Sequence, residues 1–311
     1  MKRCAACSGE AFGERRVEAL GGEAGPAMRL GLVECRRCGL VRLVPRMSDE
    51  ERASYMAAFD RMRQAGLSEK DLRKATRFFS ERADLLAGLE RGRVLDVGCG
   101  PGYFLAVMRE RGWEAEGLEP FPASVEDAGK RPGVQVHAVT LEQFQPAKSF
   151  DLITLWHVFE HVPDPLGALA RCRELLHPGG TVFLEVPNVD GLEARLSGGY
   201  WAGFLDPTHH WMYRRQSLEV LAERAGFALT RCEAVGSASD WYGFKQGLRG
   251  RLWQRGYVAG KSSGGGGGPG PLRALLGHLA AFYPVPMALA QAARLFGLGS
   301  VLRAWLNPKL P

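Results

Sequence analysis

The sequence lacks several features that would place it in other protein classes. Its 311 residues include only seven cysteines, four of them within the first 38 positions, which is too few and too clustered for a disulfide framework. The first residues contain no apolar run of the length that a secretory signal peptide needs, so we expect a cytoplasmic protein. Hydrophobic residues make up 46% and charged residues 24%, a balance that excludes a disordered or fibrous chain.

Acidic side chains are absent from the last quarter of the chain. No Asp or Glu follows Asp240, whereas nine Lys and Arg residues do, which leaves 31 basic and 34 acidic residues before it. The net charge of +6 therefore comes from the C-terminal segment, and a protein that coats nucleic acid with a uniformly basic surface is excluded. A zinc-ribbon protein that binds nucleic acid or modifies RNA remains an alternative, but few surplus cations lie between the cysteine pairs.

Four cysteines form two Cys-x-x-Cys pairs near the N-terminus, Cys4 with Cys7 and Cys35 with Cys38. Two such pairs separated by 27 residues are typical of a tetrahedral zinc site built on two turns. Because four thiolates fill the coordination shell of the ion, we expect a structural zinc rather than a catalytic one. The pattern predicts a zinc-binding module over residues 1–47.

The middle of the chain alternates strand-like and helix-like segments. Apolar, strand-like stretches begin at residues 93, 114, 134, 150 and 181, and most are separated by segments with helical spacing. This alternation predicts a parallel sheet covered by helices on both faces, which is a doubly wound α/β fold. We expect this core over residues 91–236, preceded by a helical connector over residues 48–90.

Residues 237–298 hold the basic excess, a glycine-rich tract and two apolar stretches. Residues 274–293 carry no formal charge and have the length of a membrane span, but Pro284 and Pro286 break the segment. We interpret residues 237–298 as a helical insertion before a last strand at residues 299–311. Such an insertion could form a dimer or substrate-lid surface, or contact an anionic membrane or a lipid-linked substrate at the inner face of the membrane.

A glycine-rich turn follows the first predicted strand of the core. Three glycines come after Asp96 at alternate positions, namely Gly98, Gly100 and Gly102. Glycines at this spacing either make a tight turn or let backbone amides approach a ligand at the start of a helix. Tyr103 stands where a dinucleotide fingerprint has its third glycine, which argues against a nicotinamide or flavin cofactor. Glu119 ends the second strand, where a carboxylate can accept hydrogen bonds from both ribose hydroxyls of a nucleoside.

With these motifs the sequence resembles the class I S-adenosylmethionine-dependent methyltransferases. The matching stretches are VLDVGCGPGYF, GLEP, FDLITLWHVFEHVPDP, LLHPGGTVFLEVPN and DPTHHWMYRRQSLEVLAERAGF. They lie in order over about residues 70–235. The resemblance implies a seven-stranded, mostly parallel, Rossmann-like sheet with a reversed last strand, and a cofactor across the carboxyl ends of its strands. A similar zinc module precedes the methyltransferase domain in sugar-modifying enzymes, where it helps to cover the substrate.

The resemblance also implies roles for single residues. Asp96 would lie near the amino-acid end of the cofactor, Glu119 would hold the ribose and Leu141 would border the adenine. Trp156 and His157 would lie beneath the sulfonium. The full set of implied cofactor-binding residues is Asp96, Gly98, Cys99, Gly100, Gly102, Glu119, Leu141, Trp156 and His157.

Three histidines are candidates for catalysis. A sulfonium methyl group is already activated, so the enzyme chiefly places an acceptor in line with it and, for a hydroxyl, removes a proton. His209 and His210 are the preferred bases, while His161 either acts in the site or anchors the loop after the fourth strand. We therefore expect methyl transfer to a small-molecule or glycan acceptor, with O-methylation preferred and C-methylation of a nucleotide-linked sugar as the alternative.

Overall fold

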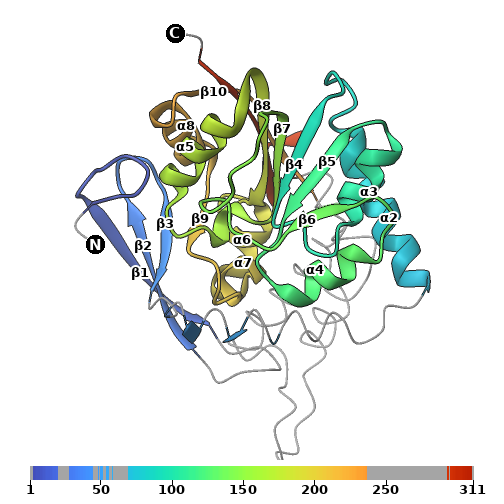
Figure 1. Cartoon of the computed structure of the whole chain (residues 1–311). Helices are drawn as coiled ribbons and strands as arrows, with labels where there is room; N and C mark the ends of the chain where they lie inside the picture. Colours follow the sequence, from blue (N-terminus) through green and yellow to red (C-terminus); the bar gives the residue numbers. More distant parts are fainter. Residues whose placement is uncertain are drawn as a thin grey trace, which may run out of the picture.

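The computed structural model describes residues 3–19, 28–44, 48, 50, 51, 54, 55, 58, 69–236, 293 and 295–309. These residues form a large mixed sheet flanked by helices and a small antiparallel sheet beside it (Figure 1). The helical insertion predicted at residues 237–298, with the contacts expected of it, falls almost entirely outside the described residues. Among the described helices, none combines the length and the hydropathy that crossing a membrane requires.

The large sheet has seven strands in the order β10-β11-β8-β7-β4-β5-β6. Its strands are β4 (Arg93–Val97), β5 (Glu114–Leu118), β6 (Gln135–His137), β7 (Phe150–Trp156), β8 (Leu176–Pro187), β10 (Phe227–Val235) and β11 (Val301–Pro308). β11 runs antiparallel to both of its neighbours, while the pairs among β4, β5, β6, β7 and β8 are parallel. The predicted doubly wound α/β fold with seven strands and a reversed last strand is confirmed.

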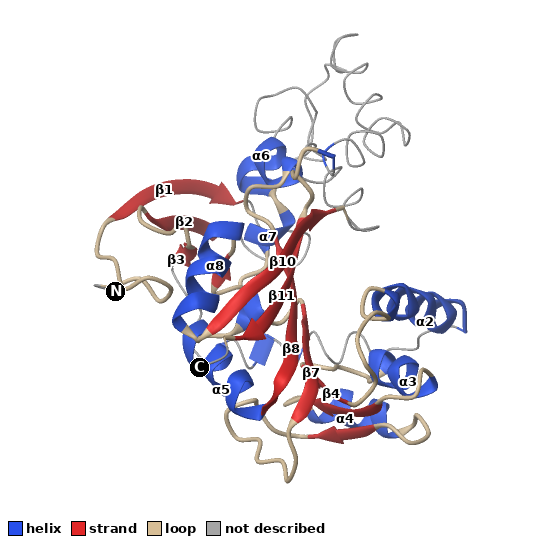
Figure 2. Ribbon diagram, turned by 90° about the horizontal axis from the view of Figure 1, so that it is seen from above, coloured by secondary structure: helices blue, strands red, loops and turns tan. Residues whose placement is uncertain are grey.

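Helices cover both faces of this sheet (Figure 2). The helices α2 (Glu69–Asp84) and α3 (Tyr103–Glu110) lie on one face, and α5 (Pro165–Leu175) and α8 (Arg215–Arg224) lie on the other, while α4 (Pro122–Gly129) contacts β6 at one edge. Shorter helical segments follow β7 and β8, namely η1 (Phe159–His161), α6 (Leu192–Ser197), η2 (Gly198–Tyr200) and α7 (Ala202–Leu205). Because apolar residues of α3 recur at helical spacing, one side of that helix is buried against the sheet.

The centre of the sheet is aromatic. The ring of Phe183 on β8 is fully buried and lies 4.5 Å from the Trp156 ring and 4.8 Å from the Trp305 ring, measured between centroids. Trp156 in turn contacts Phe104 of α3 at 5.3 Å. These contacts join three adjacent strands, β7, β8 and β11, to a helix on one face.

The small sheet has the strand order β1-β2-β3-β9 and joins the N-terminal region to the core. Its strands are β1 (Phe12–Ala19), β2 (Met28–Cys35), β3 (Val41–Val44) and β9 (Trp211–Met212). All three pairings are antiparallel, and β9 comes from the core, with Val41 opposite Met212. Leu32 and Leu43 pack with Trp201 and Phe204 in the same apolar cluster. The N-terminal segment therefore shares both a sheet and a hydrophobic core with the rest of the chain.

We predict that Phe183→Ala strongly destabilises the fold. Truncation of a fully buried aromatic ring removes its apolar contacts and leaves a cavity, which lowers the free energy of unfolding by about 3–5 kcal/mol. Urea denaturation followed by circular dichroism measures this loss. The matched control is Phe296→Ala, because Phe296 is 78% exposed and its truncation should change stability by less than about 0.5 kcal/mol. Equal effects of the two substitutions would contradict this description of the core.

Candidate active site

The turn after β4 depends on glycine for two different reasons. Gly98 and Gly100 have φ values of 68° and 51°, in the left-handed region that residues with a Cβ rarely adopt. A Cβ on Gly98 would also lie 2.5 Å from Val158, whereas a Cβ on Gly100 would meet nothing within 4 Å. Gly98 therefore permits close packing, and Gly100 leaves open space beside the backbone.

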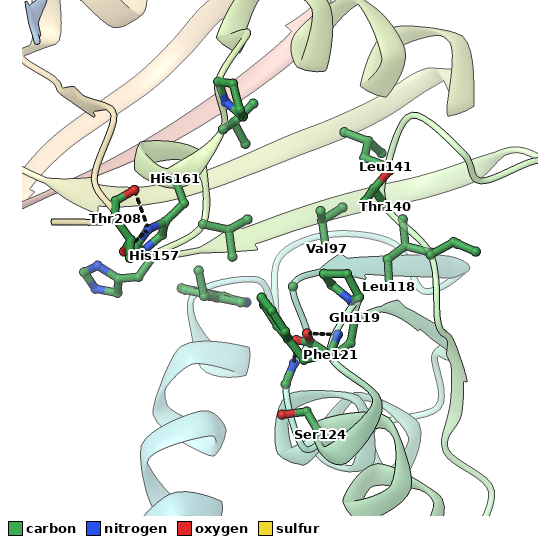
Figure 3. A pocket seen from close by; sticks show the side chains of 18 of the residues that line it. Val97, Leu118, Glu119, Phe121, Ser124, Thr140, Leu141, His157, His161 and Thr208 are labelled. Carbon is green, nitrogen blue, oxygen red and sulfur yellow. Dashed lines mark hydrogen bonds between the residues drawn. The ribbon is translucent and has the colours of Figure 1, made fainter. Parts of the chain in front are cut away.

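Glu119, directly after β5, is bound to this turn by its carboxylate. Its oxygens accept hydrogen bonds from the backbone N–H groups of Gly100 and Phe121, both at 3.0 Å (Figure 3). The backbone N–H groups of Gly98 and Cys99 also donate to the carbonyl of Leu118. The ends of β4 and β5 are thus fixed relative to each other, with a carboxylate between them.

Asp96 is buried behind the turn. It is 3% exposed and accepts a hydrogen bond of 2.6 Å from the Thr154 hydroxyl. Burial, with a smaller effect from the charge of Glu119, raises the pKa of Asp96 to about 7. Asp96, Cys99 and Gly102 were all predicted to bind the cofactor, and none of the three lines the cavity described next. Asp96 and Cys99 are buried in the fold instead.

A cavity of about 640 Å³ opens where the chain order of the sheet reverses, at the carboxyl ends of β4 and β7. Figure 3 shows Glu119 and His161 on different sides of it. Six of the nine predicted cofactor-binding residues line it: Gly98, Gly100, Glu119, Leu141, Trp156 and His157. Sequence reasoning did not assign five further lining residues that carry polar groups or rings, namely Tyr55, Phe121, Ser124, Asp206 and Thr208.

His157 bridges two buried carboxylates. Its Nδ1 lies 3.3 Å from Glu160 and its Nε2 lies 3.2 Å from Glu185, and its backbone has a φ of 54°. Glu185 also forms ion pairs with Arg82 and Arg303. Burial opposes the charged imidazole, but the hydrogen bonds to the two carboxylates outweigh it and raise the pKa of His157 to about 10. His157 is therefore a cation at neutral pH and has no lone pair for a proton.

The three histidines predicted as catalytic occupy different places. His161 lines the cavity, and burial together with the charge of His209 lowers its pKa, so its ring is neutral at pH 7. The ring of His209 lies behind it, at a centroid distance of 4.6 Å. His210 is 5% exposed, and its backbone N–H donates to the carbonyl of Glu160. Only His161 of the three lines the cavity.

The four N-terminal cysteines come together as their spacing predicts. The sulfur atoms of Cys4 and Cys38 are 3.6 Å apart, those of Cys7 and Cys35 are 3.4 Å apart, and all four lie within 4.8 Å of one another. Zn–S bonds of about 2.3 Å in a tetrahedron place sulfur atoms about 3.8 Å apart. All four side chains are buried and unbridged, so the geometry can hold a tetrahedral ion.

Comparisons with known proteins concern the same part of the chain. A family described as "Methyltransferase domain" matches residues 64–231. The ubiquinone biosynthesis O-methyltransferase of Aromatoleum aromaticum is 31% identical over 183 residues, which cover 50% of this chain and 77% of that protein. The protein of the same name from Histophilus somni is 37% identical over 112 residues, which cover 32% of this chain and 47% of that protein. The chain thus spans between about half and three quarters of the length of these relatives.

Solved structures show the same fold at low sequence identity. The complex of the Haloferax volcanii Trm112 methyltransferase activator with a methyltransferase matches with a TM-score of 0.53 and 15% identity, over 82% of this chain and 97% of that chain. The 1,6-didemethyltoxoflavin-N1-methyltransferase of Burkholderia thailandensis matches with a TM-score of 0.50 and 16% identity, over 90% and 96% of the two chains.

We predict that Asp96→Asn changes how stability depends on pH. An unfolded Asp has a pKa near 3.9, so the raised pKa of about 7 means that the native protein binds the extra proton and loses stability as the pH rises from about 4 to 7. The Asn variant keeps an acceptor for Thr154 but cannot ionise. Its free energy of unfolding should therefore rise relative to wild type by up to about 4 kcal/mol over this range and then level off.

Urea unfolding of both proteins at pH 5, 6, 7 and 8 measures this difference. Asp84→Asn is the control, because the side chain of Asp84 is 68% exposed and its exchange should change stability by less than about 0.5 kcal/mol at every pH. If the difference in the free energy of unfolding between wild type and Asp96→Asn did not change with pH, Asp96 would not be a desolvated carboxyl group.

Proposed function

This chain belongs to the methyltransferase-domain family, whose methyl donor is S-adenosylmethionine, and on that basis we propose that it methylates an oxygen atom of a small-molecule or glycan acceptor. One observation carries the proposal: a single cavity joins the glycine turn and Glu119 on one side to the neutral imidazole of His161 on the other. The relatives named as O-methyltransferases support oxygen as the atom that is methylated.

The residues of the glycine turn fit an adenosyl group. Gly100 has open space where a side chain would be, so a ligand can approach the backbone there. Each oxygen of a carboxylate can accept more than one hydrogen bond, so Glu119 can accept from ribose hydroxyls while it holds the two backbone N–H groups. Leu118, Val139 and Leu141 supply an apolar wall for the adenine. Asp96 lies behind the turn, and in its ionised form, above its raised pKa of about 7, its negative charge favours a nearby ammonium group.

The opposite side of the cavity suits a hydroxyl acceptor. The bound cofactor supplies a methyl group on a positively charged sulfur, and transfer forms an oxygen–carbon bond as the sulfur–carbon bond breaks. The chain has to orient the acceptor, exclude water and let the hydroxyl proton leave. We assign the acceptor hydroxyl to the side of the cavity lined by His161, Asp206 and Thr208, because neutral imidazole, carboxylate and hydroxyl groups meet there.

Among the three predicted catalytic histidines, this assignment retains His161 and His209. His161 faces the acceptor, and His209 stands directly behind it. His157 holds a different role, since a cation beneath the transfer path orders Glu160 and Glu185 rather than accepting a proton. We assign His210 a structural role, because its side chain is buried outside the cavity lining.

We predict that Glu119→Gln weakens binding of S-adenosylhomocysteine about 10- to 100-fold. Hydrogen bonds from ribose hydroxyls to a charged carboxylate contribute about 1.5–3 kcal/mol, and a neutral amide loses most of that. Isothermal titration calorimetry measures the change. Glu126→Gln in α4 is the matched control, because Glu126 is exposed and lies outside the cavity, and it should bind as the wild type does. Unaltered affinity in Glu119→Gln would remove the assignment of the ribose site.

The reaction itself is tested with a labelled methyl donor. Wild-type protein and Glu119→Gln are incubated with isotopically labelled S-adenosylmethionine and fractionated cell extract, and the labelled product is identified by mass spectrometry and NMR. A methoxy carbon in a small molecule or glycan is the expected product. A label on a sugar carbon would favour the alternative of C-methylation of a nucleotide-linked sugar, and a label in the RNA fraction would contradict both.

We also propose that Cys4, Cys7, Cys35 and Cys38 hold a structural zinc ion. The four thiolates would fill a tetrahedral shell and leave no position for a substrate. Backbone geometry suits the two turns, since Ser8 and Gly39 have φ values of 56° and 70° just after each pair. The cluster packs in the same apolar core as Trp211 and Tyr213, so the ion would stabilise the contact between the N-terminal segment and the core.

We predict that Cys38→Ser abolishes stoichiometric zinc binding and lowers the free energy of unfolding by several kcal/mol, because binding of a structural ion contributes directly to folding. Metal analysis of the purified protein and thermal denaturation measure both effects. Cys232→Ser, outside the cluster, should keep one equivalent of zinc and near wild-type stability. Wild-type protein purified without zinc but with unchanged stability would contradict the assignment.

A further inference from the structure

A second group of potential metal ligands lies beside the cavity, far from the cysteines in sequence. Glu160 and His161 belong to the short helix η1, and His209 lies in the loop before β9. One ligand atom from each of the three residues lies within 4.8 Å of the others. The side chains of Glu160 and His209 are 1% and 10% exposed, so the group is enclosed except where His161 lines the cavity.

Hydrogen bonds fix the orientation of both imidazole rings. Thr208 donates its hydroxyl hydrogen to Asp206 at 2.6 Å, so its oxygen can only accept from Nδ1 of His161, at 2.9 Å. Nδ1 of His209 lies 2.8 Å from the carbonyl oxygen of Gly203, which also can only accept. Both rings therefore carry a proton on Nδ1, which leaves Nε2 as the nitrogen that can bind a metal ion; the Nε2 of His209 lies 3.8 Å from an Asp206 oxygen. Metal-binding histidines commonly have this arrangement, with the second nitrogen donating to a carbonyl or a carboxylate-linked group.

Glu160 supplies an unpartnered buried oxygen. Its Oε1 is 3.3 Å from His157, but its Oε2 is buried and has no hydrogen-bond partner among the described residues. A buried carboxylate oxygen without a partner is costly, and native structures rarely leave one without a compensating ligand. His157 fixes one oxygen of this carboxylate and leaves the other for a ligand.

We propose that Glu160, His161 and His209 bind a divalent transition-metal ion, such as Zn²⁺, next to the acceptor side of the cavity. Two neutral imidazoles and one carboxylate are a typical ligand set for such ions, and three protein ligands leave a coordination position open. Glu160 balances part of the charge of the ion, and Asp206 lies close enough to affect both histidines electrostatically.

The use of the ion rests on the proposed function, whereas its binding does not. An acceptor hydroxyl that takes the open position would have its pKa lowered by the metal, so its proton leaves to water and the oxygen becomes the nucleophile. Asp206, through Thr208, would then be a positioning group for the ligand His161.

The test measures metal binding directly. Full-length protein is dialysed against a mild chelator that removes metal from nitrogen and oxygen ligands and leaves the thiolate-bound zinc in place, and Co²⁺ is then titrated. We expect one equivalent of Co²⁺ with weak visible absorption and without the intense near-ultraviolet band that thiolate ligands give. Glu160→Gln and His209→Ala should each weaken this binding by at least about 100-fold. The controls Glu174→Gln and His177→Ala, both at exposed positions, should bind Co²⁺ as the wild type does.

Folding and the cofactor site are checked in the same proteins. Each variant should keep the circular dichroism spectrum of the wild type and its affinity for S-adenosylhomocysteine, because neither Glu160 nor His209 lines the cavity. If Glu160→Gln fails to fold, His209→Ala alone decides. A wild-type protein that binds no Co²⁺ beyond the cysteine cluster, or variants that bind it unchanged, would overturn the metal site. Failure of the wild type to bind S-adenosylhomocysteine would instead overturn the proposed function.

Discussion

The side of the cavity lined by His157 and His161 depends on one buried carboxylate. Glu185 lies at the centre of the sheet with no exposed side-chain surface, and three cationic groups from three different elements contact it: Arg82 of α2, Arg303 of β11 and His157 after β7. A charge in such a place is tolerated only when it is fully paired, and removal of one partner from a buried ion pair costs about 3–5 kcal/mol. The burial of Glu185 therefore fixes the helix, the last strand and the loop after β7 relative to one another.

Further contacts link Glu185 to residues near the cavity. His157 contacts Glu185 with one nitrogen and Glu160 with the other, and its left-handed backbone turns the chain directly into η1. The backbone carbonyl of Glu160 accepts a hydrogen bond from the backbone N–H of His210, the residue that follows His209. Contacts thus connect the middle of the sheet to the histidine loop through Glu185, His157 and Glu160, whose charges are negative, positive and negative.

The sequence allowed us to predict which residues come together where those residues belong to a short motif. The strand and turn around Gly98 and Gly100, Glu119 at the end of the next strand and the two cysteine pairs each depend on local spacing, and the structure brings each set together. Contacts between distant segments could not be predicted in this way. Nothing in the spacing of Glu185 and Arg82, 103 positions apart, indicates that they pair. Spacing alone also does not show which histidine faces the cavity, since the loop that carries Asp206 and Thr208 is folded against His161 by tertiary packing.

The strand β9 immediately follows His209 and His210, and it is held at the edge of the small sheet by β3, which begins three residues after Cys38. The loop that carries the two histidines is therefore linked through the small sheet to the cluster of four cysteines. A loss of order around the four sulfur atoms would pass through β3 to β9 and the histidine loop, whereas the glycine turn lies on the large sheet.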